Sequence, residues 1–161
     1  MVNEKKCTLY KKYTSYKKCI PYLILAGFTF FFCWWFVGRR GIFGAKVDWL
    51  SQHSVLPDYF RQQFYATGKL FPEFAANLGG GQNIYHFAYY GLYSPLILPS
   101  YLLPFVKMSD YIMVISITGL TVSVLLFYYW LKSRKMDTGV AFIISLMFLL
   151  AGPCLLYTSP S

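Results

Sequence analysis

The sequence has little charge and few groups suited to acid–base or metal chemistry. Only 13% of its 161 residues are charged, whereas a soluble domain of this size carries about 25%. Six acids and two histidines are present. The four cysteines show no C-x-x-C spacing and support no disulfide framework, because Cys7 and Cys19 precede the first apolar run and Cys33 lies inside it. These absences argue against a soluble metalloenzyme and a disulfide-stapled secreted domain.

Long apolar runs account for the low charge. Three of them contain no charged residue, at residues 20–37, 111–131 and 139–156. As helices they would span roughly 27–31 Å, close to the thickness of a bilayer core. Lipid offers no partner to an unpaired backbone amide, so helices are expected. The sequence therefore predicts an all-α integral membrane protein with three transmembrane helices.

A basic segment, residues 1–19, precedes the first run. It holds six of the fifteen basic residues, Lys5, Lys6, Lys11, Lys12, Lys17 and Lys18. This position fits the positive-inside rule and contact with anionic membrane lipid, rather than a nucleic-acid interface. The run is longer than the apolar part of a signal peptide and ends without a small-x-small cleavage site. We expect a retained anchor in a bacterial cell membrane, with a cytoplasmic N-terminus.

On this topology residues 38–110 form one large outer loop. Its last apolar stretch, Ser94–Val106, has thirteen residues and three prolines, which is short for a span. If it crossed the membrane, the basic cluster at residues 132–135 would face outside, against the positive-inside rule. We therefore place it in the outer interface, lying on the membrane or dipping into it.

Local signals predict order within this loop. Residues 58–67 are expected to form a helix that ends at Gly68, with a weak Asp58–Arg61 pair on it. The run Gly79-Gly80-Gly81 predicts a flexible or tight turn. It is not a phosphate loop, because no Gly-Lys-Ser/Thr follows it.

Asp48 is the first candidate site residue, since it should lie near the outer membrane surface. It either caps a short helix that begins at Trp49, or acts as a general base on an acceptor hydroxyl or as a ligand of a divalent cation. Arg39 and Arg40 follow the first helix. They either snorkel toward headgroups or hold the phosphate of a lipid-linked donor.

Aromatic and imidazole groups offer further candidates. His53, Tyr89 and Tyr90 can contact a sugar or an acceptor, although such tyrosines are also typical of a membrane-interface belt. His53 and His86 lack a paired carboxylate spacing, so we predict no metal site on them.

In these stretches the sequence resembles the YfhO family of bacterial multi-spanning membrane proteins. The resemblance covers roughly residues 20–153. It rests on VDWLSQH (Val47–His53) followed by Tyr59 and Phe60, on NLGGGQNIYHFAYY (Asn77–Tyr90), and on the Ser-Pro-plus-apolar stretch from Ser94 to Phe105. Each piece alone is weak, and the combination is moderately specific.

The resemblance implies a GT-C-like architecture with an acidic residue, here Asp48, on the first outer loop. It also implies transfer of a sugar from a polyprenyl-phosphate donor to a cell-envelope polymer such as teichoic acid. Members have many more helices than three, so we expect the native chain to continue past Pro153, and residues 154–161 (CLLYTSPS) to be a non-native tail. A transporter or lipid-carrier flippase, or a non-catalytic membrane anchor, is the alternative. A transporter would carry ionisable residues inside its spans, and the three runs have none.

Overall fold

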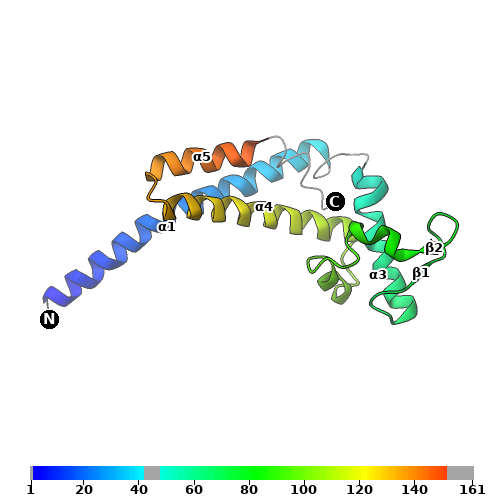
Figure 1. The fold of residues 1–161 in the computed structure, drawn as a ribbon. Coiled ribbons are helices and arrows are strands. Elements are labelled where there is room, and N and C mark those ends of the chain that lie inside the picture. The colour runs from blue at the N-terminus through cyan, green and yellow to red at the C-terminus, as the bar shows by residue number, and fades with distance from the viewer. Residues whose placement is uncertain (1, 42–47, 152–161) are drawn as a thin grey trace.

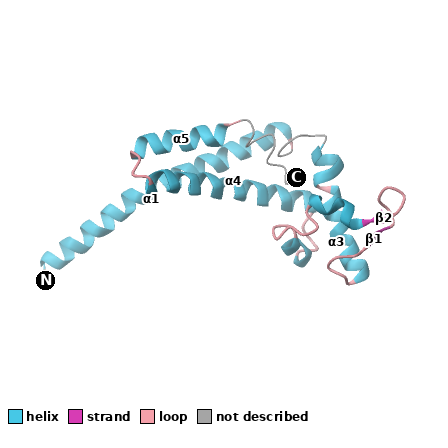
Figure 2. Ribbon diagram, in the orientation of Figure 1, coloured by secondary structure: helices cyan, strands magenta, loops and turns pink. Residues whose placement is uncertain are grey.

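The chain is mainly helical (Figures 1 and 2). The structure, a computed structural model, describes residues 2–41 and 48–151, with the side chains of all but residues 2–18, Arg40 and Leu50. In chain order the elements are α1 (Val2–Arg40), η1 (Trp49–His53), α3 (Val55–Thr67), β1 (Phe74–Ala75), β2 (Gln82–Asn83), η2 (Ile84–Tyr90), η3 (Leu98–Leu102), α4 (Met108–Ser133) and α5 (Thr138–Leu150).

Two helices are long and apolar enough to cross a membrane. They are the Cys19–Arg39 part of α1 and the whole of α4, so each contains one of the predicted runs. The helix formed by the third run, α5, is shorter than the run itself. The helix α5 ends at Leu150, where Ala151 is extended (φ −61°, ψ 124°), so the prediction of a helix over residues 139–156 is wrong at residue 151. Residues 152–156 lie outside the described part, and three spans remain a prediction.

The helices α1, α4 and α5 lie side by side (Figure 1), with α4 in contact with both others. The rings of Tyr22 and Tyr128 meet edge to face with centroids 4.8 Å apart, and those of Phe127 and Phe148 are also 4.8 Å apart. Aromatic pairs of this geometry stabilise helix contacts beyond simple burial. Many large apolar side chains point away from the bundle, among them Trp34. Such a distribution suits helices whose outer surface faces lipid.

Hydroxyl groups inside these helices bond to their own backbone. The Thr29 hydroxyl donates to the Leu25 carbonyl at 2.7 Å, and the buried Ser145 hydroxyl donates to the Ala141 carbonyl at 2.8 Å. Both are four-residue back-bonds, which satisfy a polar group without help from water.

The helix α3 confirms the predicted stop at Gly68, which is left-handed (φ 69°) and donates its N–H to the Phe64 carbonyl. It begins at Val55, three residues earlier than predicted. The Asp58–Arg61 pair is present at 2.7 Å. The strands β1 and β2 pair antiparallel, with Phe74 opposite Asn83 and Ala75 opposite Gln82. The three consecutive glycines all have positive φ in the turn between them, which confirms the tight turn.

The stretch from residue 94 to residue 106 contains turns and the five-residue 3₁₀ helix η3 rather than an α-helix. It leads directly into α4 at Met108. A segment of this form is too short and too irregular to be a transmembrane helix.

Candidate functional site

The first part of the site is η1, a five-residue π-helix preceded by Asp48. Trp49 is only 3% exposed, and its carbonyl accepts both the Ser54 N–H (3.2 Å) and the Ser54 hydroxyl (2.7 Å). Asp48 is exposed and makes no side-chain capping bond to the helix. The geometry therefore does not favour the capping role. π-Helical segments are rare and occur frequently at functional sites.

His53 closes the same π-helix. Its side chain is 6% exposed, and its Nδ1 has no hydrogen-bond partner among the residues that the structure describes. Burial lowers the pKa of the imidazole, while the negative charge of Asp48 acts in the opposite direction. Burial thus favours the neutral form of His53, and the carboxylate of Asp48 is near enough to influence it.

Tyr90 joins this group from η2. Its hydroxyl donates a 2.7 Å hydrogen bond to Oε1 of Gln52, and its ring stands edge-on to His53 with centroids 6.2 Å apart. The ring centroids of Tyr89 and Tyr90 are 4.1 Å apart. A hydrogen bond with Tyr89 raises the pKa of the Tyr90 phenol, and burial and the charge of Asp48 raise it further.

The structure therefore brings together four of the six predicted site residues, namely Asp48, His53, Tyr89 and Tyr90. Gln52, which positions Tyr90, was missed because a glutamine in WLSQH carries no chemical signal of its own. An exposed carboxylate, a neutral imidazole and a phenol in one group can accept a proton and hold a polyhydroxylated ligand.

The two arginines behave differently. Arg39 is exposed, and its guanidinium lies over the Trp35 ring at 4.9 Å from the centroid, a cation–π contact typical of a membrane interface. The side chain of Arg40 lies outside the described part. Their predicted role in phosphate binding stays a prediction.

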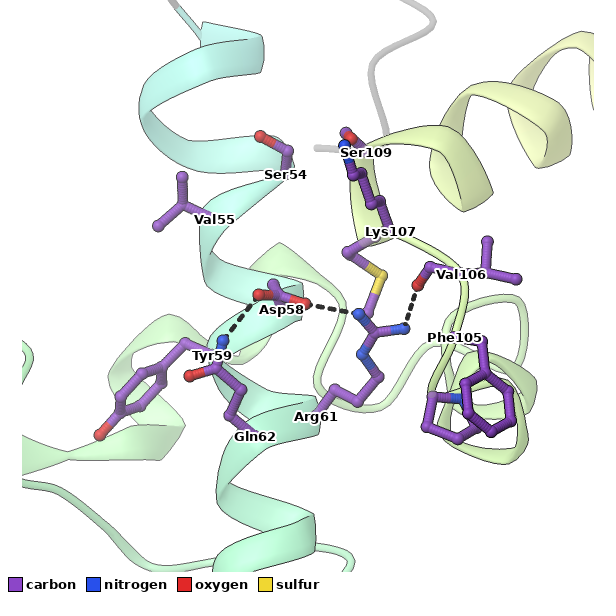
Figure 3. A pocket seen from close by; sticks show the side chains of 12 residues that line it. Ser54, Val55, Asp58, Tyr59, Arg61, Gln62, Phe105, Val106, Lys107 and Ser109 are labelled. Carbon is purple, nitrogen blue, oxygen red and sulfur yellow. Dashed lines mark hydrogen bonds and ion pairs between the residues drawn. The ribbon is translucent and has the colours of Figure 1, made fainter.

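A second polar feature is an open pocket of about 490 Å³ between α3 and the start of α4 (Figure 3). Arg61 lies at its wall, 7% exposed, and donates to the carbonyls of Val106 (2.8 Å) and Leu103 (3.3 Å) and to Asp58 (2.7 Å). These partners leave the guanidinium little freedom to bind a ligand. We read Arg61 as a clamp between α3 and the chain that precedes α4.

No group of three or more His, Cys, Asp or Glu residues suited to a metal occurs within residues 2–41 and 48–151. The proposed divalent cation therefore has no protein cage in this part of the chain. Asp48 alone would supply one or two oxygen ligands, and a magnesium ion in such a setting takes its remaining ligands from substrate phosphates and water.

Two apolar helices of spanning length with large exposed apolar side chains fit a helical membrane protein. The family model described as "Bacterial membrane protein YfhO" matches residues 18–159, which is most of the chain. The chain belongs to this family of bacterial membrane proteins, and the resemblance in its motifs is confirmed. No curated protein and no solved structure matches it.

Proposed function

We propose that the protein acts as a GT-C-like glycosyltransferase of the bacterial cell membrane. It transfers a sugar from a polyprenyl-phosphate donor to a cell-envelope polymer such as teichoic acid. The observation that carries the proposal is the group of Asp48, His53, Tyr89 and Tyr90. An exposed carboxylate lies there beside a neutral imidazole and two phenols, on a segment that follows the membrane-capable helix α1.

The proposed topology is multi-pass. The N-terminus lies in the cytoplasm, and α1, α4 and the apolar run at residues 139–156, which begins with α5, cross the bilayer. Residues 38–110 lie on the outer face. The lysines in the N-terminal part of α1, before its apolar part, support this orientation through the positive-inside rule, as do Lys132, Arg134 and Lys135 at the end of α4. Arg134 also lies over the Trp130 ring at 5.6 Å, as expected for an interface residue.

The proposed reaction is a direct displacement at the anomeric carbon. The oxygen of an acceptor hydroxyl forms the new C–O bond to the anomeric carbon. The bond from that carbon to the donor phosphate breaks at the same time, and the electron pair of the broken bond leaves with the phosphate. Asp48 orients the hydroxyl and takes its proton, with His53 beside it. Arg39 and Arg40 hold the departing phosphate, and stabilisation of that charge is the larger expected contribution.

The test is Asp48→Asn in the full-length protein, measured as sugar incorporated into envelope polymer by membranes. General-base catalysis contributes about 10²–10⁴-fold, so a loss of that order is expected. Glu73→Gln is the matched control, since Glu73 is an exposed acid of the same loop and lies outside the group around Asp48. Equal activity in the two variants would remove Asp48 from the mechanism and favour the flippase or anchor alternative.

A further inference from the structure

The residues before α4 form an apolar projection. We use "proline loop" for residues 94–106 and "tip" for residues 102–106. Leu102 is 83% exposed and Phe105 is 98% exposed, the two highest fractions among the large hydrophobic side chains of the described chain. Leu103 and Val106 beside them are also exposed. Single exposed apolar residues are common, but a contiguous apolar patch marks an interaction surface.

Four carbonyls of the proline loop accept hydrogen bonds from side chains of the neighbouring helices. Arg61 donates to those of Leu103 and Val106 (Figure 3 shows the bond to Val106). The Tyr65 hydroxyl donates to the Tyr101 carbonyl at 2.6 Å, and the Tyr111 hydroxyl donates to the Leu96 carbonyl at 2.7 Å. A loop in water needs no such donors, because solvent supplies them. Irregular backbone at membrane depth does need them.

Most N–H groups of the loop also donate hydrogen bonds within the loop. Three positions, Pro95, Pro99 and Pro104, have no N–H to satisfy. Short-range turns take up most of the others, with bonds from Ile97 and Leu98 to the Ser94 carbonyl, from Ser100 to Ile97, from Leu103 to Ser100 and from Val106 to Leu103. The backbone of this loop is thus nearly self-sufficient in hydrogen bonds.

The proline loop also lies beside α4 rather than beyond its end (Figure 1). Leu96 and Ile97 line a mainly apolar cavity of about 260 Å³ together with Ile112 and Gly119 of α4. At about 1.5 Å per residue, Gly119 lies about 16 Å along the axis from Met108, in a helix about 39 Å long. The first part of the loop, at Leu96 and Ile97, is therefore level with the first turns of a membrane-capable helix.

We propose that the tip inserts into the lipid leaflet that the N-terminal end of α4 enters. The apolar side chains of Leu102, Leu103 and Phe105 contact acyl chains, and Lys107, which follows the tip directly, lies at the headgroup level. The occupant of this surface is lipid because the loop packs through Leu96 and Ile97 against the first turns of the membrane-capable helix α4. The carbonyls of Leu103 and Val106 in the tip are also already bonded to Arg61. This inference needs only that α4 crosses the membrane and is independent of the proposed glycosyl transfer.

The test uses single-cysteine variants of the full-length protein in vesicles of phosphatidylcholine and phosphatidylglycerol, with the native cysteines replaced. Leu102→Cys and Phe105→Cys report on the tip. Phe74→Cys is the matched control, because Phe74 is 61% exposed and lies on β1, away from α4 (Figure 1). The side chains at all three positions are largely free of packing, so the variants should fold.

Two readings are taken at each position. The first is the rate of reaction with a charged, membrane-impermeant maleimide. Apolar surroundings disfavour the thiolate, and one pKa unit corresponds to about tenfold in thiolate, so labelling at the tip should be about tenfold slower or more. The second is quenching of an attached fluorophore by nitroxide-bearing lipid and by aqueous iodide. Lipid quenching at the tip and iodide quenching at position 74 are expected.

Iodide quenching at position 105 as strong as at position 74 would show a tip exposed to water and overturn the proposal. Protection from both quenchers would show that protein covers the tip, and this would also overturn it. Because the readout is lipid contact, either result is separable from the Asp48→Asn assay.

Discussion

Replacing Arg61 by methionine removes the clamp between α3 and the proline loop while keeping an apolar stem of similar length. Arg61 is 7% exposed and donates to two carbonyls, at 2.8 Å and 3.3 Å. The two bonds are only partly buried, so the loss of the donor costs about 1 kcal/mol at each carbonyl, the lower end of the range for an unsatisfied group. The Asp58 carboxylate is 33% exposed, so its ion pair with Arg61 adds less than about 1 kcal/mol after solvent screening. We expect Arg61→Met to weaken the attachment of the loop by about 2–3 kcal/mol in total, most of it from the two carbonyls.

Hydrogen exchange measured by mass spectrometry on the full-length protein in vesicles checks this value. A loss of 2–3 kcal/mol corresponds to roughly 30- to 140-fold faster opening of the loop amides. The amides to follow are those of Ser100, Leu103 and Val106, which bond within the loop. Asp58→Asn is the control, because it removes the ion pair and leaves both carbonyl bonds in place. If the loop amides of Arg61→Met exchanged no faster than those of Asp58→Asn, the two carbonyl bonds of Arg61 would not stabilise the loop, and our reasoning would be refuted.

Two further predictions follow from local geometry. Burial lowers the pKa of His53 while Asp48 raises it, so Asp48→Asn should lower that pKa further. Since the folded pKa lies below the unfolded value of about 6.5, the contribution of His53 to stability is complete above that pH and is lost as pH falls. Nuclear magnetic resonance titration of labelled imidazole measures this shift, and an unchanged pKa would contradict the proximity of the two groups. Gly68→Ala should destabilise the end of α3 by about 1–2 kcal/mol, because Gly68 has φ 69° with open space where a Cβ would lie. Amide exchange in the last turn measures it, and Gly119→Ala, inside α4 with similar open space and without positive φ, should show no such loss.

The sequence was informative wherever the physical cause of structure is local. Uncharged runs of about twenty residues predicted the apolar parts of α1 and α4, since helix length follows directly from bilayer thickness. Gly68 and the three consecutive glycines predicted a helix stop and a tight turn, because both need backbone conformations that other residues avoid. The Asp58–Arg61 pair followed from spacing on one helix.

Features that depend on contacts across the chain were not predictable. Arg61 reaches carbonyls 42 and 45 residues away, and no pattern near Arg61 indicates this. The π-helix of η1 has no distinctive composition. The start of α3 at Val55 was also missed, because Pro57 is tolerated within a first turn and does not fix where that turn begins.

The candidate site was predictable in part: its residue types could be chosen from the sequence, but their proximity could not. Asp48, His53, Tyr89 and Tyr90 were chosen separately, as an acid near the membrane, an isolated imidazole and two possible sugar contacts. Their proximity comes from the Gln52–Tyr90 hydrogen bond, which joins residues 38 positions apart. A sequence can supply the chemical types, but only the fold shows which of them lie together.

The helix α3 links the proposed site to the proposed lipid contact. It contacts η1, which follows Asp48, and η2, which ends at Tyr90. It also contacts η3 of the proline loop and the start of α4. Through Arg61 and Tyr65 it holds two carbonyls of the tip and one of η3. On the proposed topology, the depth at which the tip enters lipid would set the height of Asp48 above the bilayer, because α3 contacts both regions. A polyprenyl-phosphate donor has its reactive bond at the headgroup layer, so a fixed height is what such a substrate requires, and positioning of this kind accounts for much of catalysis.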